Sequence, residues 1–460
     1  MLFSSITFLY YFLPLVFIIY LIVPNKFKNI VLLIFSLLFY FYGEPKYIII
    51  LLLSCFINYI AGMLIEKYRN KSKLILVLCI SYNVIQLLYF KYTDFFITNI
   101  NNIFNTNIGL FRIVMPIGIS FFTFQTLSYV VDVYRKDVKA AKNFFDFATY
   151  VSLFPQLVAG PIVRYKDVEK ELKERKTTFD YFGNGVKRFI IGLSKKVLIA
   201  NILGQLCTSI TSMSEMTVLG SWINSISFTL QIYFDFSGYS DMAIGIGLMF
   251  GFHFLENFNY PFIAKSITDF WRRWHISLSS FFRDYVYIPL GGNRVNKLKW
   301  FRNIFIVWFL TGFWHGAAWN FIMWGLYFAI ILILEKNIWG KYLEKTKVLR
   351  YIYTIFLVVI SFTIFNANTF NEVINSLKNM FLINKINFVN PETIYHIRNY
   401  IFIFIIAIIS STPLLKILIK KIKYKKIIDI LEIIYYFLLL IVVNAFLVDS
   451  SFNPFLYFRF

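Results

Sequence analysis

Apolar side chains along this chain come in long, nearly uninterrupted blocks. The blocks occupy residues 6–23, 29–42, 46–65, 74–90, 111–131, 189–209, 218–251, 301–334, 352–366, 398–412 and 427–447. Several reach the ~20 residues that an α-helix needs to cross a bilayer, and those of about 14–15 are marginal. Backbone polar groups in lipid need internal partners, so such spans must be helical. The pattern predicts an all-α membrane protein with about ten or eleven crossings, built as a single domain over residues 1–460.

Composition agrees with this class. The chain is 58% hydrophobic and 15% charged, whereas a soluble domain is about half apolar and a quarter charged. The net charge of +22 would suggest nucleic acid in a soluble protein, but basic cytoplasmic loops explain it here, and no nucleic-acid partner is expected. Cys55, Cys79 and Cys207 lie in apolar runs without metal-ligand spacing, and we interpret them as packing residues.

The distribution of basic residues predicts the topology. Lysines and arginines follow the first, third and fifth apolar runs, whereas the loop 92–110 has none. The positive-inside rule then places the basic loops in the cytoplasm and the N-terminus outside the cell membrane. The basic segments 164–196 and 265–302 are expected at the inner face too, the first as an amphipathic segment.

Two apolar stretches are expected to contain an interruption of the helix. SLFPQLVAGPIVR (152–164) contains Pro155, Gly160 and Pro161, which argues against a simple helix and favours a re-entrant element. The run 301–334 has basic flanks on both sides, so it must enter the membrane and return. That places a turn near WHGAAWN (314–320).

One of four histidines, His315, lies deep in an apolar run, in FLTGFWHGAAWNFIMWG. An ionisable residue at membrane depth is a functional-site hypothesis by default. A neutral imidazole can accept a proton near neutral pH, and small neighbours such as Gly312 and Gly316 leave room for a ligand or a close helix. The alternative is a core histidine with one hydrogen bond. His253 and His396 have uninformative neighbours and are expected to be structural or exposed.

His275 lies in a basic and aromatic stretch, WRRWHISLSSFFRDYVYIPLGGNR (271–294). One interpretation is an interfacial helix, with the histidine at the surface of the membrane. The other is that Arg272, Arg273 and Arg283 bind an anionic substrate. Asp235 and Asp241 are expected to hold helices together by pairing with an arginine, although a proton path is the alternative. No motif predicts a metal site or a phosphate-binding loop.

Several long motifs occur in an order that resembles the membrane-bound O-acyltransferase superfamily, and its alginate O-acetyltransferase branch in particular. They are PIGISFFTFQTLSYVVDVYR (116–135), LFPQLVAGPIVR (153–164), YFDFSGYSDMAIGIGLMFGFHFLENFNYPF (233–262), DFWRRWHISLSSFFRDYVYIPLGGNR (269–294) and FLTGFWHGAAWNFIMWG (309–325). The resemblance thus covers roughly residues 116–325.

This resemblance implies a fold and a set of site residues. Transmembrane, re-entrant and amphipathic helices would surround a central tunnel, with His315 as the catalytic histidine and His275 as its companion. Trp271, Trp314 and Asn320 join the three arginines as candidate substrate contacts.

The resemblance also implies the reaction. An acetyl group would pass from cytoplasmic acetyl-CoA, with no permanently bound cofactor, toward a hydroxyl of a cell-surface polysaccharide. A separate extracytoplasmic partner with a serine-esterase-like fold of the SGNH type would assist. One alternative is D-alanyl transfer to teichoic acid from a carrier-protein thioester. A transporter or flippase is the alternative of another class, because intramembrane charge and broken helices would serve it too.

Overall fold

The computed structural model describes residues 1–158, 160–422, 425–449, 452–454 and 456. These residues fold into helices joined by loops, and none of them forms a strand. The chain divides into two compact units: unit 1 is Met1–Phe189 with Ser240–Leu255, and unit 2 is Ile190–Tyr239 with Glu256–Phe460. The expected all-α class is confirmed, whereas the single domain expected over residues 1–460 stays a prediction.

Unit 1 contains the first eight α-helices and parts of two longer ones. The eight are α1 (Leu13–Ile22), α2 (Lys28–Gly43), α3 (Ile48–Lys67), α4 (Ser72–Phe104), α5 (Ile119–Arg135), α6 (Phe144–Ser152), α7 (Phe154–Leu157) and α8 (Tyr165–Lys173). Helix α9 (Phe179–Ser194) begins in unit 1, and helix α11 (Val218–Met249) ends there. A π-helical turn at Phe8–Phe12 precedes α1, and 3-10 turns at Asn25–Phe27 and Arg69–Lys71 precede α2 and α4.

Unit 2 contains the remaining helices. They are α10 (Asn201–Thr211), α12 (Ile267–Trp271), α13 (Ile276–Phe282), α14 (Lys297–His315), α15 (Trp319–Leu334), α16 (Gly340–Glu344), α17 (Leu349–Asn366), α18 (Phe370–Met380), α19 (Pro391–Ser410), α20 (Leu414–Lys420) and α21 (Lys425–Asp449). Short π-helical turns at Lys195–Ala200, Arg283–Tyr287 and Glu335–Trp339 continue α9, α13 and α15, and a 3-10 turn at Pro261–Ile263 precedes α12.

Eight helical segments of the described chain are long and apolar enough to cross a membrane. They are Asn25–Gly43, Ile48–Lys67, Arg69–Phe104, Phe179–Thr211, Trp319–Glu344, Leu349–Asn366, Pro391–Ser410 and Asp429–Asp449. The basic segment 164–196, expected to be amphipathic, forms α8 and then the start of the fourth of these segments.

The eight segments are fewer than the ten or eleven crossings counted from the apolar runs. Three runs contain none of the eight: 6–23 forms the shorter apolar helix Phe8–Ile22, 111–131 gives α5, and 218–251 contains α11. The run 301–334 contributes α15 but not α14. Helix α5 has 17 residues and is too short to be counted, whereas α11 carries Asp235 and Asp241, which lower its mean hydropathy. Helix α14 carries Lys297, Lys299 and Arg302 in its first two turns.

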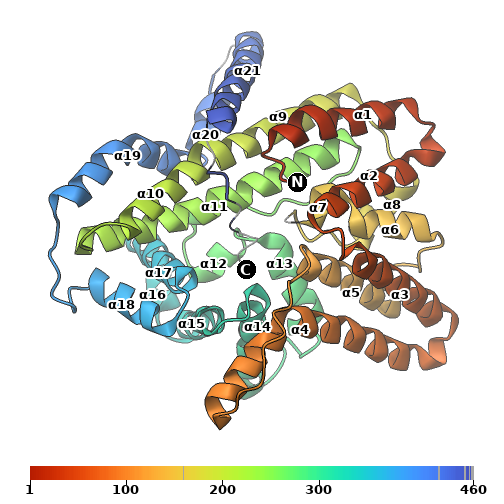
Figure 1. Cartoon of the computed structure of the whole chain (residues 1–460), viewed down its shortest axis with the longest axis horizontal. Coiled ribbons are helices and arrows are strands. Elements are labelled where there is room, and N and C mark those ends of the chain that lie inside the picture. The colour runs from red at the N-terminus through yellow and green to blue at the C-terminus, as the bar shows by residue number, and fades with distance from the viewer. Residues whose placement is uncertain (159, 423–424, 450–451, 455, 457–460) are drawn as a thin grey trace. The chain divides into compact units, whose positions relative to one another are not determined.

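Helices α3, α4 and α5 of unit 1 lie side by side (Figure 1). A buried polar network joins them: Asn83 Nδ2 donates to Asn58 Oδ1 over 2.9 Å, and Thr126 Oγ1 donates to Asn83 Oδ1 over 3.2 Å. A side chain at Gly62 would overlap the ring of Tyr129, so α3 can approach α5 only because residue 62 is glycine. Small residues and interhelical hydrogen bonds hold membrane helices together where the hydrophobic effect is weak.

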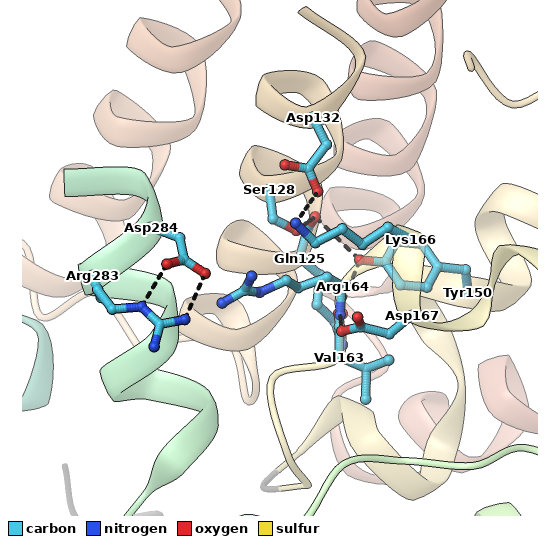
Figure 2. A network of polar contacts seen from close by, with 10 residues as sticks. All are labelled: Gln125, Ser128, Asp132, Tyr150, Val163, Arg164, Lys166, Asp167, Arg283 and Asp284. Carbon is cyan, nitrogen blue, oxygen red and sulfur yellow. Dashed lines mark hydrogen bonds and ion pairs between the residues drawn. The ribbon is translucent and has the colours of Figure 1, made fainter. Parts of the chain in front are cut away.

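The stretch 152–164 breaks as the sequence predicts. Helix α6 ends at Ser152, α7 spans four residues, and the described backbone from 160 to 164 is not helical. The backbone of this stretch is held in place by hydrogen bonds within unit 1 (Figure 2), in which Tyr150 Oη donates to the carbonyl of Val163 over 3.0 Å. Lys166 lies 3.7 Å from the buried carboxylate of Asp132 in α5. Irregular backbone is tolerated at membrane depth only where protein surrounds it, as it does here.

The core of unit 2 is rich in aromatic side chains. Trp271, Trp274, Trp308, Trp324 and Phe328 are all buried in one hydrophobic cluster. The ring of Trp271 lies 4.6 Å from that of Trp308 and 4.9 Å from that of Phe328, both edge to face. Such pairs stabilise packing by about 0.5–1.5 kcal/mol beyond their buried area. This cluster forms the surroundings in which the candidate site lies.

Candidate active site

His315 is the last residue of helix α14, and the three residues that follow it are not helical. Gly316 and Ala318 have extended backbone conformations, and α15 begins at Trp319. A side chain at Gly316 would overlap the ring of Phe321, so only glycine fits after the histidine. The turn predicted near residues 314–320 is confirmed, and it places the imidazole at the C-terminal end of a helix.

Aromatic rings from three helices surround the His315 side chain, whose residue is 9% exposed. The ring centroids of Trp314, Trp324 and Phe365 lie 4.9, 5.0 and 5.2 Å from that of His315. These residues belong to α14, α15 and α17. An imidazole in such an enclosure is shielded from bulk water and held at a fixed position.

Two glycines bring the helices of this enclosure together. Gly312 in α14 and Gly325 in α15 face each other, with the position of a Cβ on Gly312 only 3.3 Å from Gly325 Cα. The same Cβ would overlap the backbone oxygen of Phe321. The small residues that the sequence places around His315 therefore serve close helix contact.

His275 lies in the protein interior and is 1% exposed. This burial does not fit a side chain that lies on an exposed interfacial helix, which was one of the two interpretations of its segment. It precedes α13 with a φ of +45°, a left-handed conformation that costs a non-glycine residue about 1–3 kcal/mol. Burial lowers the pKa of His275 to about 3, so the ring is neutral at physiological pH. The short helices on either side, α12 and α13, explain the difference, because the segment folds inward instead of lying flat as one interfacial helix.

Trp314 contacts both histidines. Its ring centroid lies 4.9 Å from that of His315 and 6.1 Å from that of His275. The two histidines, forty residues apart in the sequence, are thus brought to the same indole within unit 2. This confirms that they belong to one region, which the sequence alone suggested only through their motifs.

Asn320 holds the enclosure from its other side. It is 3% exposed, and its Nδ2 donates to the carbonyl of Phe365 over 3.2 Å. Its Oδ1 has no hydrogen-bond partner among the described residues. Because Phe365 packs on His315, Asn320 positions a wall of the enclosure and keeps one acceptor oxygen unused.

A cavity of about 920 Å³ lies in unit 2, and the three predicted arginines all line it. Four further basic residues also line it, namely Lys265, Lys336, Lys341 and Arg350, against the acidic Asp269, Glu335 and Glu344. The excess of positive charge suits an anionic ligand. Trp271 lines the cavity as well, and its ring lies 5.6 Å from Trp324, which contacts His315. The packed rings of Trp271 and Trp324 therefore lie between the cavity and the histidine.

The three arginines differ in their pairing. Arg273 Nε donates to Asp269 over 3.0 Å, and Arg283 Nε donates to Asp284 over 2.7 Å (Figure 2). The carboxylate raises the pKa of Arg283, which stays charged. Arg272 makes no ion pair within the described chain and is exposed. Arg272 is therefore the arginine of the three whose charge is most available to a ligand.

Glu335 is a site residue that the sequence analysis missed. It is 5% exposed, and its carboxylate accepts hydrogen bonds from the backbone of Ile267 over 2.8 Å and of Thr268 over 3.1 Å. It also accepts one from Thr268 Oγ1 over 2.7 Å. A carboxylate at a helix N-terminus satisfies donors that have no partner within the helix. Glu335 thus fixes the start of α12, which carries Trp271 and leads to Arg272.

The buried aspartates of α11 both form ion pairs, Asp241 with an arginine as expected and Asp235 with a lysine instead. Asp235 lies 2.6 Å from Lys196 in unit 2, and Asp241 lies 2.6 Å from Arg188 in unit 1. His253 pairs with Glu171 over 2.7 Å within unit 1 and is half exposed, which fits a structural role.

Fold and site together define a multi-pass helical membrane protein that encloses a buried histidine among aromatic rings. The family follows from sequence comparison. A model of the membrane-bound O-acyltransferase family matches residues 138–377, more than half of the chain, and the chain belongs to this family. It is accordingly an O-acyltransferase, and the resemblance stated from its motifs is confirmed.

Three relatives show which members of the family this chain resembles more. The chain is 41% identical to a probable alginate O-acetylase of Pseudomonas aeruginosa, over 80% of this chain and 72% of the relative. It is 36% identical to a peptidoglycan O-acetyltransferase of Helicobacter pylori, over 84% and 81%. It is 29% identical to a teichoic acid D-alanyltransferase of Bacillus subtilis, over 57% of this chain and 71% of that one. The similarity is thus greater to the two acetyl-transferring relatives.

Proposed function

We propose that this enzyme transfers acetyl groups from acetyl-CoA to a hydroxyl acceptor, for the O-acetylation of a cell-surface polysaccharide. The greater similarity to the two relatives named for O-acetylation supports the acetyl group and the polymer. The basic cavity supports a donor that carries phosphates, because arginines bind phosphate through charge-assisted hydrogen bonds. The observation that carries the proposal is the enclosed histidine at the end of α14. Its neighbour Trp324 packs on Trp271, which lines this cavity.

In the proposed reaction His315 acts as general base. A ring nitrogen takes the proton of the acceptor hydroxyl as its oxygen attacks the thioester carbonyl. The new carbon–oxygen bond forms, the carbon–sulfur bond breaks, and the proton passes to the departing thiolate. The C-terminal end of α14 carries a partial negative charge that stabilises the transient imidazolium by about 0.3–1 kcal/mol. Such proton transfer typically contributes 10²–10⁴-fold to the rate.

The basic cavity is proposed to open to the cytoplasm of a cell whose plasma membrane holds the enzyme. The charge of Arg272 and its neighbours supports this orientation, since basic segments stay on the inner side. The same rule places the N-terminus outside. Acetyl-CoA then enters from the side where it is made.

The test compares two histidine variants. Purified His315→Gln should keep its thermal stability and lose transfer from labelled acetyl-CoA by at least about 10²-fold. His396→Gln, which changes a partly exposed histidine of α19, is the matched control and should transfer at the wild-type rate. A wild-type rate of transfer in folded His315→Gln would refute the role of His315 as general base.

The similarity to the D-alanyltransferase supports a second candidate, D-alanyl transfer from a carrier-protein thioester. Incubation with labelled acetyl-CoA, in parallel with a carrier protein charged with labelled D-alanine, separates the two. Label acquired only from the carrier protein would favour the second. The transporter alternative is set aside, because the chain belongs to an acyltransferase family.

Delivery to the polymer is proposed to need a separate extracytoplasmic protein with a serine-esterase-like fold. The family resemblance supports this partner. Reconstitution of the enzyme with and without such a protein tests it: full polymer acetylation by the enzyme alone would refute the need for a partner.

A further inference from the structure

The residues around His275 are held by a short paired segment within unit 2. The backbone amide of Asn259 donates to the carbonyl of Arg273 over 2.9 Å, and the amide of Ile276 donates to the carbonyl of Asn257 over 2.9 Å. These two bonds bracket His275, whose backbone is left-handed. Asn257 therefore helps to hold the backbone turn that presents the histidine.

The side chain of Asn257 continues this contact. It is fully buried, and its Oδ1 faces three groups: the Ser277 amide at 3.1 Å, Ser277 Oγ at 2.9 Å and His275 Nδ1 at 3.2 Å. A backbone amide can only donate, so the amide atom that faces it must be the oxygen. The orientation of the Asn257 side chain is thereby fixed.

This orientation decides where the proton of His275 resides. A carboxamide oxygen only accepts, so the imidazole nitrogen that bonds it must carry a hydrogen. Ser277 Oγ lies 3.5 Å from His275 Nδ1 and 2.9 Å from Asn257 Oδ1, so the hydroxyl donates its hydrogen to Asn257 Oδ1. His275 Nδ1 then donates to the same oxygen. The neutral ring is then protonated on Nδ1 and bare on Nε2.

We infer that Asn257 is a positioning residue, which fixes His275 as the Nδ1–H tautomer and so makes Nε2 a hydrogen-bond acceptor for a second hydroxyl of the acyl acceptor, other than the one that His315 deprotonates. The inference rests on the proposed function, because it names a group of that reaction. Nε2 is buried and has no partner among the described residues. A substrate group that meets this nitrogen must therefore be a donor, and a polysaccharide carries further hydroxyls beside the one that reacts.

The ring environment keeps this tautomer neutral. His275 contacts the rings of Phe236 at 4.6 Å, Phe258 at 6.5 Å and Trp314 at 6.1 Å, besides the two polar residues above. None of these side chains titrates near neutral pH. His315 is an ionisable group that packs on the same Trp314.

The direct test reads the tautomer by ¹⁵N NMR of the wild-type enzyme labelled on histidine. Four histidines give few signals, and the spectrum of His275→Gln assigns those of His275. We expect Nδ1 to be protonated and Nε2 to be unprotonated at neutral pH. A proton on Nε2 would overturn the inference. Since this readout needs no turnover, it can fail or succeed independently of the proposed acetyl transfer.

Two substitutions at Asn257 test the consequence for activity. Asn257→Asp keeps an acceptor oxygen and adds a charge that stabilises imidazolium, which turns Nε2 into a donor. Transfer should therefore persist at high pH, with an acid limb moved upward relative to wild type. Asn257→Leu removes the acceptor, and transfer should fall by about 10–100-fold at every pH.

The control is Asn375→Asp, which adds the same charge at an exposed position of α18. It should leave the pH profile unchanged. An Asn257→Asp profile identical to wild type, or an Asn257→Leu enzyme as active as wild type, would contradict a positioning role.

Discussion

The contact between α14 and α15 provides a sharp test of how His315 is positioned. In Gly312→Ala the new Cβ would overlap the backbone oxygen of Phe321 and lie 3.1 Å from its carbonyl carbon. Backbone atoms cannot rotate away as a side chain can. The helices must therefore separate by on the order of 1 Å to restore ordinary carbon–oxygen contact at ~3.3–3.6 Å.

The separation has two consequences of different size. Overpacking costs about 1–3 kcal/mol, but alanine favours a helix over glycine by about 1 kcal/mol, so the net loss of stability is about 0–2 kcal/mol. The rate of acetyl transfer is more sensitive to this helix separation than the stability of the protein is. His315 lies one turn beyond Gly312 and packs on Trp324 of the other helix, and a misplacement of about 1 Å can cost about 10²-fold in rate.

The assay measures acetyl transfer and thermal unfolding on the same purified sample. Gly312→Ala should lose about 10²-fold in rate while it unfolds within a few degrees of wild type. Gly183→Ala is the matched control, because a Cβ there meets nothing within 4 Å in helix α9. A wild-type rate in Gly312→Ala, or an equal loss in Gly183→Ala, would refute the idea that close helix contact positions the histidine.

Three further predictions concern other parts of the site. Glu335→Ala should lower thermal stability, because each donor of α12 left unsatisfied costs about 1–3 kcal/mol, and an unchanged unfolding temperature would contradict this role of the carboxylate. Wild-type enzyme should lose about 1.4 kcal/mol of stability per pH unit as pH falls from ~6.5 toward 3, since unfolding then frees a neutral, buried His275 to take up a proton. His275→Gln, compared in the same detergent, should lack this component, and parallel curves would argue against it. Arg272→Gln should raise KM for acetyl-CoA severalfold and weaken its salt dependence with kcat nearly unchanged, as measured by initial rates; a fall in kcat alone would point to another role.

Much of the fold could be predicted from hydropathy and breakers. The apolar runs correspond to helices because lipid leaves the backbone few other choices. Pro155, Gly160 and Pro161 predicted the break after α6 through local chemistry that needs no tertiary context. The number of long apolar helices was harder to predict, because a run such as 218–251 is apolar on average yet carries buried charges that are stabilised by partners distant in sequence.

The site was predicted less completely. The motif placed His315 and His275 in one region, but the burial of His275 depends on contacts with Phe236 and Trp314 that lie about forty residues away on either side. Asn257 and Glu335 went unnoticed for a similar reason. An asparagine or a glutamate carries no local signal that its side chain will bond a segment distant in the chain.

The break after His315 has a consequence for how the protein is made. Helix α14 is not among the segments apolar enough to enter a membrane by themselves, whereas α15 is. Only the three residues 316–318 join them, and the glycines at 312 and 325 let the two helices pack closely. We expect the ribosome-bound chain to insert the two helices together as a hairpin, with the more apolar α15 carrying α14 into the bilayer. His315 would thus reach membrane depth through the hydrophobicity of the helix that follows it.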